Sequence, residues 1–358
     1  MTLPTIPRLV KAFAPTWISR PRGPVRAVVA MTRRCNLKCD TCRTWSFPRG
    51  KEMTPDEVAR LFTAMPDLAW LDLTGGEPFL RKDVVDVFRA VLSATPSLAV
   101  LHFPTNGWYR KRALECALLV REKRPDVTLL VTVSVDGPQA IHDRIRGREG
   151  SFDRAMETLR EMRRIPGVQS YVGTTVGPEN RGFLTDLRAA LTSELPGFDD
   201  RWWHWNLVQE SGHFFANEGI ETLSGPQASS LVREQLARRG PPLSPVDLME
   251  WMYLVNVHAV LQGDPLRLDC RALHSSCFVS SDAVLYPCHV WDRPLADLRD
   301  RGFRMDEVWA LDAVQEARQA VRRLDCGGCF TPCEAYTTLA GAPLRSLVLS
   351  ATRAVGLP

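Results

Sequence analysis

The alternation of short apolar runs with helix-like segments is the feature that most restricts how this chain can fold. Six runs are predicted to be buried strands, because they are short, apolar and rich in β-branched and aromatic residues. They span residues 25–32, 68–74, 97–105, 127–135, 168–176 and 202–208. Strands that alternate with helices form βαβ units and a parallel sheet. We therefore predict an α/β fold, a closed or partly closed barrel with its ligands at the carboxyl ends of the strands.

The helix expected over residues 51–65 carries its own start signal. Thr54 is a favourable N-cap, Pro55 suits the first helical position, and Glu57 completes a capping box. These signals predict a helix that begins directly after Thr54.

The alternation of strand-like and helix-like segments ends after Gly212. Residues 246–264 predict one long helix, and a boundary near residues 263–268 precedes short strands and cysteines. Residues 277–288 predict a β-hairpin that turns at SSDA. The predicted parts are a basic arm (1–24), the barrel (25–213), a helical connector (214–267), a small cysteine-rich α+β domain (268–338) and a C-terminal amphipathic helix (339–358).

Charge and hydropathy limit the compartment and the partners. The net charge of +4 over 358 residues is too small to indicate nucleic-acid binding. From Met1 to Cys39 the chain has no Asp or Glu and eight Lys or Arg residues. This basic stretch leads directly into a cysteine cluster, so we interpret it as a built-in arm and not as a transit peptide. We see no signal peptide and no apolar run long enough to span a membrane, and therefore expect a cytoplasmic protein.

The last segment has apolar residues at helical spacing. They are Leu344, Leu347, Val348, Ala351 and Val355. We expect this face to pack on the protein. The alternative is an interfacial helix that, with the basic arm, makes peripheral contact with an anionic membrane.

Ten cysteines are unusual for a chain expected in a reducing compartment, where clustered thiols indicate metal binding. Cys35, Cys39 and Cys42 form a C-x3-C-x2-C pattern directly after the first predicted strand. A structural zinc site needs four ligands, so a zinc ion here requires a distant fourth residue. A [4Fe–4S] cluster held by three thiolates leaves one iron free for a substrate or cofactor.

The pattern and its context resemble the radical S-adenosylmethionine (SAM) superfamily. The resemblance rests on CNLKCDTC at 35–42, GGEP at 75–78, TNG at 105–107 and SVDGP at 134–138. Each motif follows one of the first four predicted strands, in the order that the family has. The resemblance covers about residues 25–212 and implies a partial (β/α)6 barrel of the TIM type.

The resemblance also implies cofactors and their ligands. Cys35, Cys39 and Cys42 would bind three irons of a [4Fe–4S] cluster, and SAM would chelate the fourth. Contacts with SAM are expected from Gly75 and Gly76 (close approach to the methionine part), Glu77 (its ammonium), Ser134 and Asp136 (the ribose hydroxyls), and Asn106, which a simple turn would also explain. The implied reaction is reductive cleavage of SAM to a 5′-deoxyadenosyl radical that abstracts hydrogen from a substrate. A donor such as flavodoxin or ferredoxin would supply the electron to this oxidoreductase- or transferase-type enzyme.

The second cysteine group resembles the SPASM/twitch extension of radical SAM enzymes. Cys270 and Cys288 fit its first pair, with Ala283 where the family has Gly. Cys326, Cys329 and Cys333 supply the later group. The resemblance implies one auxiliary [4Fe–4S] cluster, for which these five cysteines compete, while Cys277 is interpreted as core packing. A zinc ribbon is the alternative.

The substrate is less constrained. Glu210 and His213 follow the sixth predicted strand and are candidates for substrate contact or proton handling. The region before Val25 is too short for a leader-peptide recognition domain, which favours a small-molecule or lipid-linked substrate over a peptide. A peptide-modifying maturase is the alternative, and a non-catalytic zinc-binding scaffold is a distant one.

Overall fold

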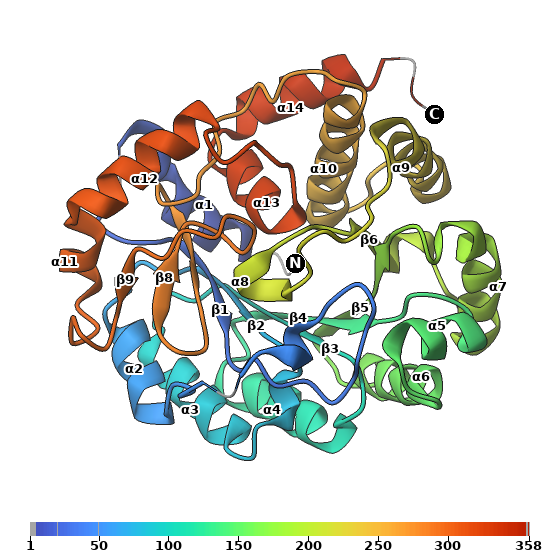
Figure 1. Ribbon diagram of the computed structural model, residues 1–358, viewed down its shortest axis with the longest axis horizontal. Coiled ribbons are helices and arrows are strands. Elements are labelled where there is room, and N and C mark those ends of the chain that lie inside the picture. The colour runs from blue at the N-terminus through green and yellow to red at the C-terminus, as the bar shows by residue number, and fades with distance from the viewer. Residues whose placement is uncertain (1–4, 20, 49, 356, 358) are drawn as a thin grey trace.

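The computed structural model describes residues 5–19, 21–48, 50–355 and 357. Its described residues form a nine-stranded sheet in the order β6-β5-β4-β3-β2-β1-β7-β8-β9 (Figure 1). The six predicted strands are confirmed as β1 (Arg26–Ala30), β2 (Trp70–Thr74), β3 (Val100–Thr105), β4 (Thr128–Ser134), β5 (Val168–Val176) and β6 (Trp203–Leu207). Each pairs in parallel with its neighbour. The chain therefore has the predicted α/β fold of a partial TIM-type barrel.

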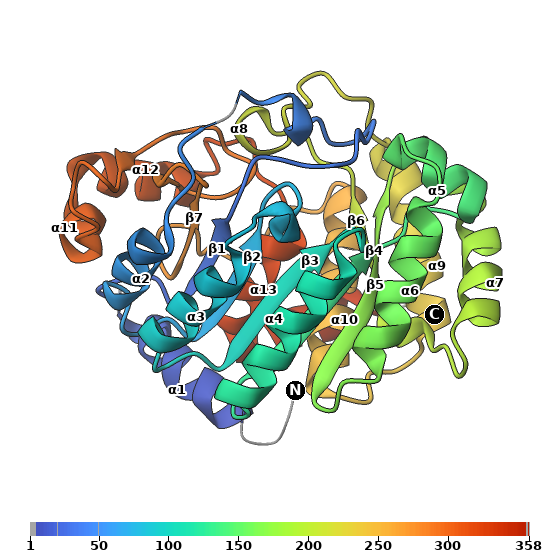
Figure 2. The same cartoon turned by 90° about the horizontal axis from the view of Figure 1, so that it is seen from below.

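One face of the parallel sheet carries the helices that connect its strands (Figure 2). They are α2 (Pro55–Thr63), α3 (Val84–Ala94), α4 (Arg110–Lys123), α5 (Gln139–Arg146), α6 (Ser151–Arg163) and α7 (Leu184–Glu194). The predicted capping box is confirmed, because Glu57 N donates to Thr54 Oγ1 at 3.2 Å and Thr54 N donates to Glu57 Oε2 at 2.9 Å. Apolar strand residues that face these helices, such as Val131 and Val133, are completely buried.

The opposite, inner face of the sheet is covered by later helices (Figure 2). They are α9 (Gly225–Arg239), α10 (Pro245–Leu261) and α13 (Pro332–Ala340). Trp70 of β2 stacks on Tyr336 of α13 with ring centroids 6.1 Å apart. His204 of β6 pairs with Glu250 of α10 at 3.1 Å. The predicted long helix is confirmed as α10, and it closes the inner face beside β6.

The C-terminal region extends the same sheet. β7 (Ser276–Val279) pairs in parallel with β1, while β8 (Val284–Tyr286) and β9 (Ala296–Asp297) continue it in antiparallel order. The predicted hairpin is confirmed by β7 and β8. Ala283 in its turn has φ +68°, a backbone conformation that favours glycine. The helices α11 (Met305–Ala310) and α12 (Asp312–Arg323) follow, and the division of the chain into domains stays a prediction.

The expected basic arm contains a helix, α1 (Thr5–Ile18), which packs against the amino-terminal side of the sheet. Arg8 pairs with Asp126 just before β4, with Nη1 and Oδ2 2.7 Å apart. At the other end of α1, Trp17 Nε1 donates to the carbonyl of Ala340 at 2.9 Å. Within the described residues, no helix combines the length and the apolar character needed to cross a bilayer.

The expected packing of the C-terminal apolar face is wrong. In α14 (Pro343–Arg353), Leu344 is 81% exposed and Val348 is 67% exposed. The packed face is polar instead, because Ser350 Oγ accepts from Asn256 Nδ2 of α10 at 2.7 Å. Arg353 Nη1 donates to the Oδ1 of the same asparagine at 2.8 Å. These contacts fix the rotation of α14 and turn its apolar residues outward.

Candidate functional site

The three N-terminal cysteines share one pocket at the carboxyl ends of the parallel strands. The remaining residues that line it are Leu37, Thr44, Trp45, Gly76, Pro104, Thr105, Asn106, Ser134 and Arg146. They come from the loops after β1 and β2, the ends of β3 and β4, and the end of α5. The pocket therefore lies where a barrel of this type places its ligands.

Each thiol of this pocket has a polar side chain beside it. The pairs are Thr44 Oγ1 with Cys42 Sγ at 3.0 Å, Asn106 Nδ2 with Cys35 Sγ at 3.9 Å, and Arg146 Nη1 with Cys39 Sγ at 3.9 Å. Burial raises the pKa of Cys35 to about 12 and that of Cys39 to about 11. Metal binding must therefore displace the thiol protons. Polar groups around the sulfur atoms are suited to thiolates that bind iron.

The three thiols that line this pocket are candidate ligands for an iron–sulfur cluster. In a [4Fe–4S] cluster each thiolate binds a different iron, so the ligands are spread over three corners of a cube. Three thiols around one pocket, each with a polar neighbour, fit this arrangement.

Gly75 and Gly76 bring the loop after β2 against the cysteine loop. A Cβ atom on Gly76 would lie within 3.0 Å of the carbonyl oxygen of Arg34, and one on Gly75 would meet the carbonyl oxygen of Thr32 in the same way. Gly76 N donates to Thr32 O at 2.8 Å, and Glu77 N donates to Arg34 O at 2.9 Å. The two glycines thus allow the backbone of the cysteine loop to lie directly against the loop after β2. Gly76 also lines the pocket.

We predict that Gly76→Ala displaces the cysteine loop. The new Cβ meets backbone atoms, which cannot rotate away, so the substitution should cost roughly 1–3 kcal/mol. We expect at least a twofold loss of iron bound after anaerobic reconstitution, together with a lower thermal midpoint. Gly182→Ala is the matched control, because nothing lies within 4 Å of a Cβ there. Equal iron content in the two variants would contradict the prediction.

Glu77 is directed into the protein and does not line the pocket. Its carboxylate accepts hydrogen bonds from Asn106 N at 2.8 Å, Thr105 Oγ1 at 3.0 Å and Phe79 N at 3.2 Å. Burial raises its pKa to about 7. The side chain therefore ties the 3-10 helix η2 (Pro78–Leu80) to the end of β3. Its contact with the ammonium group of SAM stays a prediction.

Ser134 and Asp136 differ in their surroundings. Ser134 lines the pocket, but Asp136 is buried beside it and pairs with Arg146, with Oδ2 and Nε 2.7 Å apart. Asp136 Oδ1 also accepts from Thr175 N at 3.0 Å. Arg146 thus contacts both Asp136 and Cys39, and sequence reasoning missed it. No local pattern marks it, because α5 brings it to the pocket from outside every motif.

The C-terminal cysteines gather in a second group. Cys270 and Cys288 lie in one buried apolar cluster. Cys329 interacts electrostatically with Cys270, Cys288, Cys326 and Cys333. Cys277 is completely buried in the main core, where the sequence predicted it.

Glu334, which sequence reasoning missed, is buried next to Cys333. Burial raises the pKa of its carboxyl group to about 7. The carboxylate accepts a hydrogen bond from Ser276 Oγ at 2.7 Å.

The structure does not bring Glu210 and His213 together in the cysteine pocket. Glu210 is exposed and accepts from Gly219 N at 3.0 Å. His213 is buried in α8 (Gly212–Phe215), where it stacks on Tyr286 at 4.3 Å. Its Nε2 lies 3.1 Å from the carbonyl oxygen of Cys288. His213 therefore joins α8 to the second cysteine group, and the substrate roles of both residues stay predictions.

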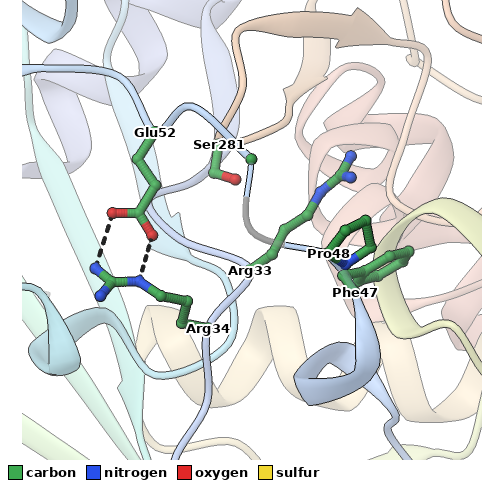
Figure 3. Close-up of a pocket in the computed structure, with 7 residues that line it drawn as sticks. Arg33, Arg34, Phe47, Pro48, Glu52 and Ser281 are labelled. Atoms are coloured by element: carbon green, nitrogen blue, oxygen red, sulfur yellow. Dashed lines mark hydrogen bonds and ion pairs between the residues drawn. The ribbon is translucent and has the colours of Figure 1, made fainter.

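A second, outer cleft of about 190 Å³ lies beside the cysteine loop (Figure 3). It is lined by Arg33, Arg34, Phe47, Pro48, Gly50, Glu52 and Ser281. Arg34 makes a two-point ion pair with Glu52, at 2.8 and 2.9 Å. Arg33 lies 3.3 Å from Asp282 of the hairpin turn. Both guanidinium groups thus have carboxylate partners within the protein.

Comparisons with known proteins identify the family. The model of the "Radical SAM superfamily" matches residues 29–187. GTP 3′,8-cyclase of Aquifex aeolicus is 30% identical over 339 residues, 86% of this chain and 95% of that protein. AdoMet-dependent heme synthase of Oleidesulfovibrio alaskensis is 23% identical and covers 89% of this chain and 82% of its own length. The solved structure "Native anSMEcpe with bound AdoMet" shares the fold, with a TM-score of 0.57, 15% identity and coverage of 91% and 99%. The chain belongs to the radical SAM superfamily, whose members use a [4Fe–4S] cluster and SAM.

Proposed function

We propose that this chain is an enzyme that cleaves SAM at a [4Fe–4S] cluster bound by Cys35, Cys39 and Cys42, and that its substrate is a small molecule. The observation that carries the proposal is the shared pocket, which combines three thiols with Gly76 and Ser134 at the strand ends. When bound, cluster and SAM supply a 5′-deoxyadenosyl radical that abstracts hydrogen from the substrate.

The protein's own groups orient these cofactors and exclude water. Thr44 and Asn106 lie beside thiols and would hydrogen-bond thiolate sulfur. The positive charge of Arg146 stabilises the thiolate of Cys39. The hydroxyl of Ser134 is available to a polar part of SAM, and Leu37 restricts the entry of water. Asp136 and Glu77 hold Arg146 and the end of β3 in position.

An auxiliary [4Fe–4S] cluster in the second cysteine group is part of the proposal, and the cysteine-rich C-terminal region is consistent with it. Four of the five gathered thiols would bind it. Cys329 is the best supported, because it interacts with each of the other four.

The substrate class rests on the relatives that align over most of the chain. Their names refer to heme and to GTP, which are small molecules. A peptide-modifying enzyme is the alternative, and a lipid-linked substrate would suit the exposed apolar face of α14. A reducing protein such as flavodoxin or ferredoxin would supply the electron.

An anaerobic reconstitution tests the function directly. We expect about eight irons with matching sulfide per chain, and release of 5′-deoxyadenosine after addition of SAM and dithionite. Zinc in place of iron, with no deoxyadenosine, would overturn the proposal. A small-molecule substrate should accelerate deoxyadenosine release from a fractionated metabolite pool, whereas a peptide substrate should do so from the peptide fraction.

The auxiliary site gives a separate prediction. Cys329→Ala should lower the iron content from about eight to about four per chain, because a four-iron cluster loses a ligand that interacts with all the others. Cys277→Ala is the control: it removes a completely buried thiol from the main core and should leave the iron content unchanged. Iron and sulfide analysis after reconstitution measures both. The assignment would be refuted if Cys329→Ala kept about eight irons while Cys277→Ala lost iron.

A further inference from the structure

The helices that cover the inner face of the sheet leave some of its side chains partly exposed. Along β4 the residues on the helix-covered face are fully buried, whereas Leu130, Thr132 and Ser134 on the inner face keep partial exposure. On β3, the side chain of His102 is 24% exposed although it lies in the middle of the strand. The interior of a barrel of this type is normally filled by side chains. Here, by contrast, side chains do not fill all the space over β3 and β4.

A row of hydrogen-bonded polar groups crosses this face over four neighbouring strands. Arg26 Nε donates to Asp72 Oδ2 at 2.9 Å, Asp72 Oδ1 lies 2.9 Å from His102 Nδ1, and His102 Nε2 lies 2.9 Å from Thr132 Oγ1. Burial disfavours the charge on Asp72, but Arg26 and His102 outweigh it and hold the pKa of Asp72 below its usual value. Asp72 is therefore an acceptor only, and the ring proton of a neutral His102 lies on Nδ1. Nε2 is left to accept a hydrogen bond from Thr132.

The packing around Thr132 fixes the direction of its hydroxyl group. A Cβ atom on Gly173 of β5 would collide with Cγ2 of Thr132, so this glycine makes room for the methyl group. With the methyl over Gly173, the hydroxyl lies toward His102. Thr132 lies two residues before Ser134 on β4, and His102 lies two residues before Pro104 on β3. Ser134 and Pro104 both line the cysteine pocket. One pleat is roughly 6–7 Å along a strand, so the hydroxyl lies directly under the floor of that pocket.

The charges on the inner face are already paired. Besides Asp72, the buried guanidinium of Arg26 binds the carbonyl oxygen of Cys333 and, at 3.0 Å, Thr337 Oγ1. His204 and Glu250 form another pair beside β6. Arg26 thus has little capacity left for a phosphate group, whereas Thr132 keeps a free acceptor lone pair. The face suits a ligand that donates hydrogen bonds and carries no strong negative charge.

We propose that Thr132 and His102 form the substrate site of this enzyme and take a hydroxyl or amino group of an uncharged or cationic small molecule. The group donates to Thr132 Oγ1, whose own hydrogen is directed to His102 Nε2. When the substrate group is deprotonated, the electron pair of its O–H or N–H bond stays on the substrate oxygen or nitrogen, Thr132 receives the proton, and the proton of Thr132 moves to Nε2. The resulting imidazolium faces the carboxylate of Asp72. The assignment of a substrate rests on the proposed function, but the geometry of the row does not.

The test uses NMR of histidine ring nitrogens in the full chain, labelled with ¹⁵N-histidine, loaded with iron and kept anaerobic and oxidised. His102→Asn assigns the His102 signals by their loss. We expect Nδ1 protonated and Nε2 unprotonated, and a saturable shift of Nε2 on titration with glycerol as a small hydroxyl probe. Thr132→Val should weaken this response at least tenfold, and Thr132→Ser should retain it.

Sodium tripolyphosphate is the second probe and should leave the His102 signals in place. The proposal is overturned if Nε2 carries the proton, if glycerol shifts it equally in Thr132→Val, if glycerol shifts nothing, or if tripolyphosphate shifts it instead. The readout measures neither iron nor deoxyadenosine. A negative result therefore leaves the proposed function standing, and a failure of SAM cleavage in the unaltered enzyme leaves this result valid.

Discussion

Replacing Cys35, Cys39 and Cys42 together by alanine is expected to abolish 5′-deoxyadenosine formation and to leave about four irons per chain. All three thiols line one pocket, whereas the other gathered cysteines belong to the C-terminal region and do not line it. In the proposed function, loss of the first set removes the cluster that would bind SAM. Iron, sulfide and deoxyadenosine measured on one anaerobic preparation would check both outcomes.

The matched control for this triple variant is Cys116→Ala. Cys116 is completely buried in α4 and belongs to the main apolar core. Its loss should cost about 1 kcal/mol of packing and keep about eight irons and full deoxyadenosine release. Deoxyadenosine formation by the triple variant would contradict the assignment of the three cysteines.

Replacing Arg26 by methionine should destabilise the protein by about 3–5 kcal/mol. The side chain is 2% exposed, and its loss leaves the buried carboxylate of Asp72 without its guanidinium partner. It also leaves the carbonyl oxygen of Cys333 without a donor. The change should appear as a large fall in the urea midpoint of the iron-loaded protein.

Two further variants serve as a control and as a partial rescue for this prediction. Arg89→Met removes an ion pair with Asp86 whose side chains are both 61% exposed, so it should shift the midpoint very little. Arg26→Met combined with Asp72→Asn should recover part of the loss, because no unpaired charge is then buried. The explanation fails if Arg26→Met behaves like Arg89→Met, or if the double variant is no better than the single one.

The sequence predicted those parts of the fold whose signals are local. Each of the six parallel strands is an apolar run with a helix after it, and the hairpin around Ala283 has a turn between two apolar arms. The pairing of β7 with β1 was not predicted, because nothing local indicates a partner at the other end of the chain. The exposed face of α14 was mispredicted, since hydropathy alone does not register the hydrogen bonds of Asn256 that fix the helix rotation.

The candidate site was predictable where a motif follows a strand. The three cysteines and Gly76 were expected at one place, and they line one pocket. Arg146 was not expected, because its position depends on how α5 packs. The row through His102 was likewise invisible, because it joins residues that are each ordinary on their own strands. Such a row emerges only from the register between neighbouring strands.

The pairing of β1 with β7 has a consequence for how the chain matures during synthesis. β1 leaves the ribosome early, but its second hydrogen-bonding edge stays open until Ser276–Val279 follow, roughly 250 residues later. An open strand edge is a template for intermolecular pairing, and long-range parallel pairing is slow to form. The nascent chain therefore carries an open strand edge while the intervening residues are translated, which favours aggregation. Chaperone supply and growth temperature should then affect the yield of soluble protein.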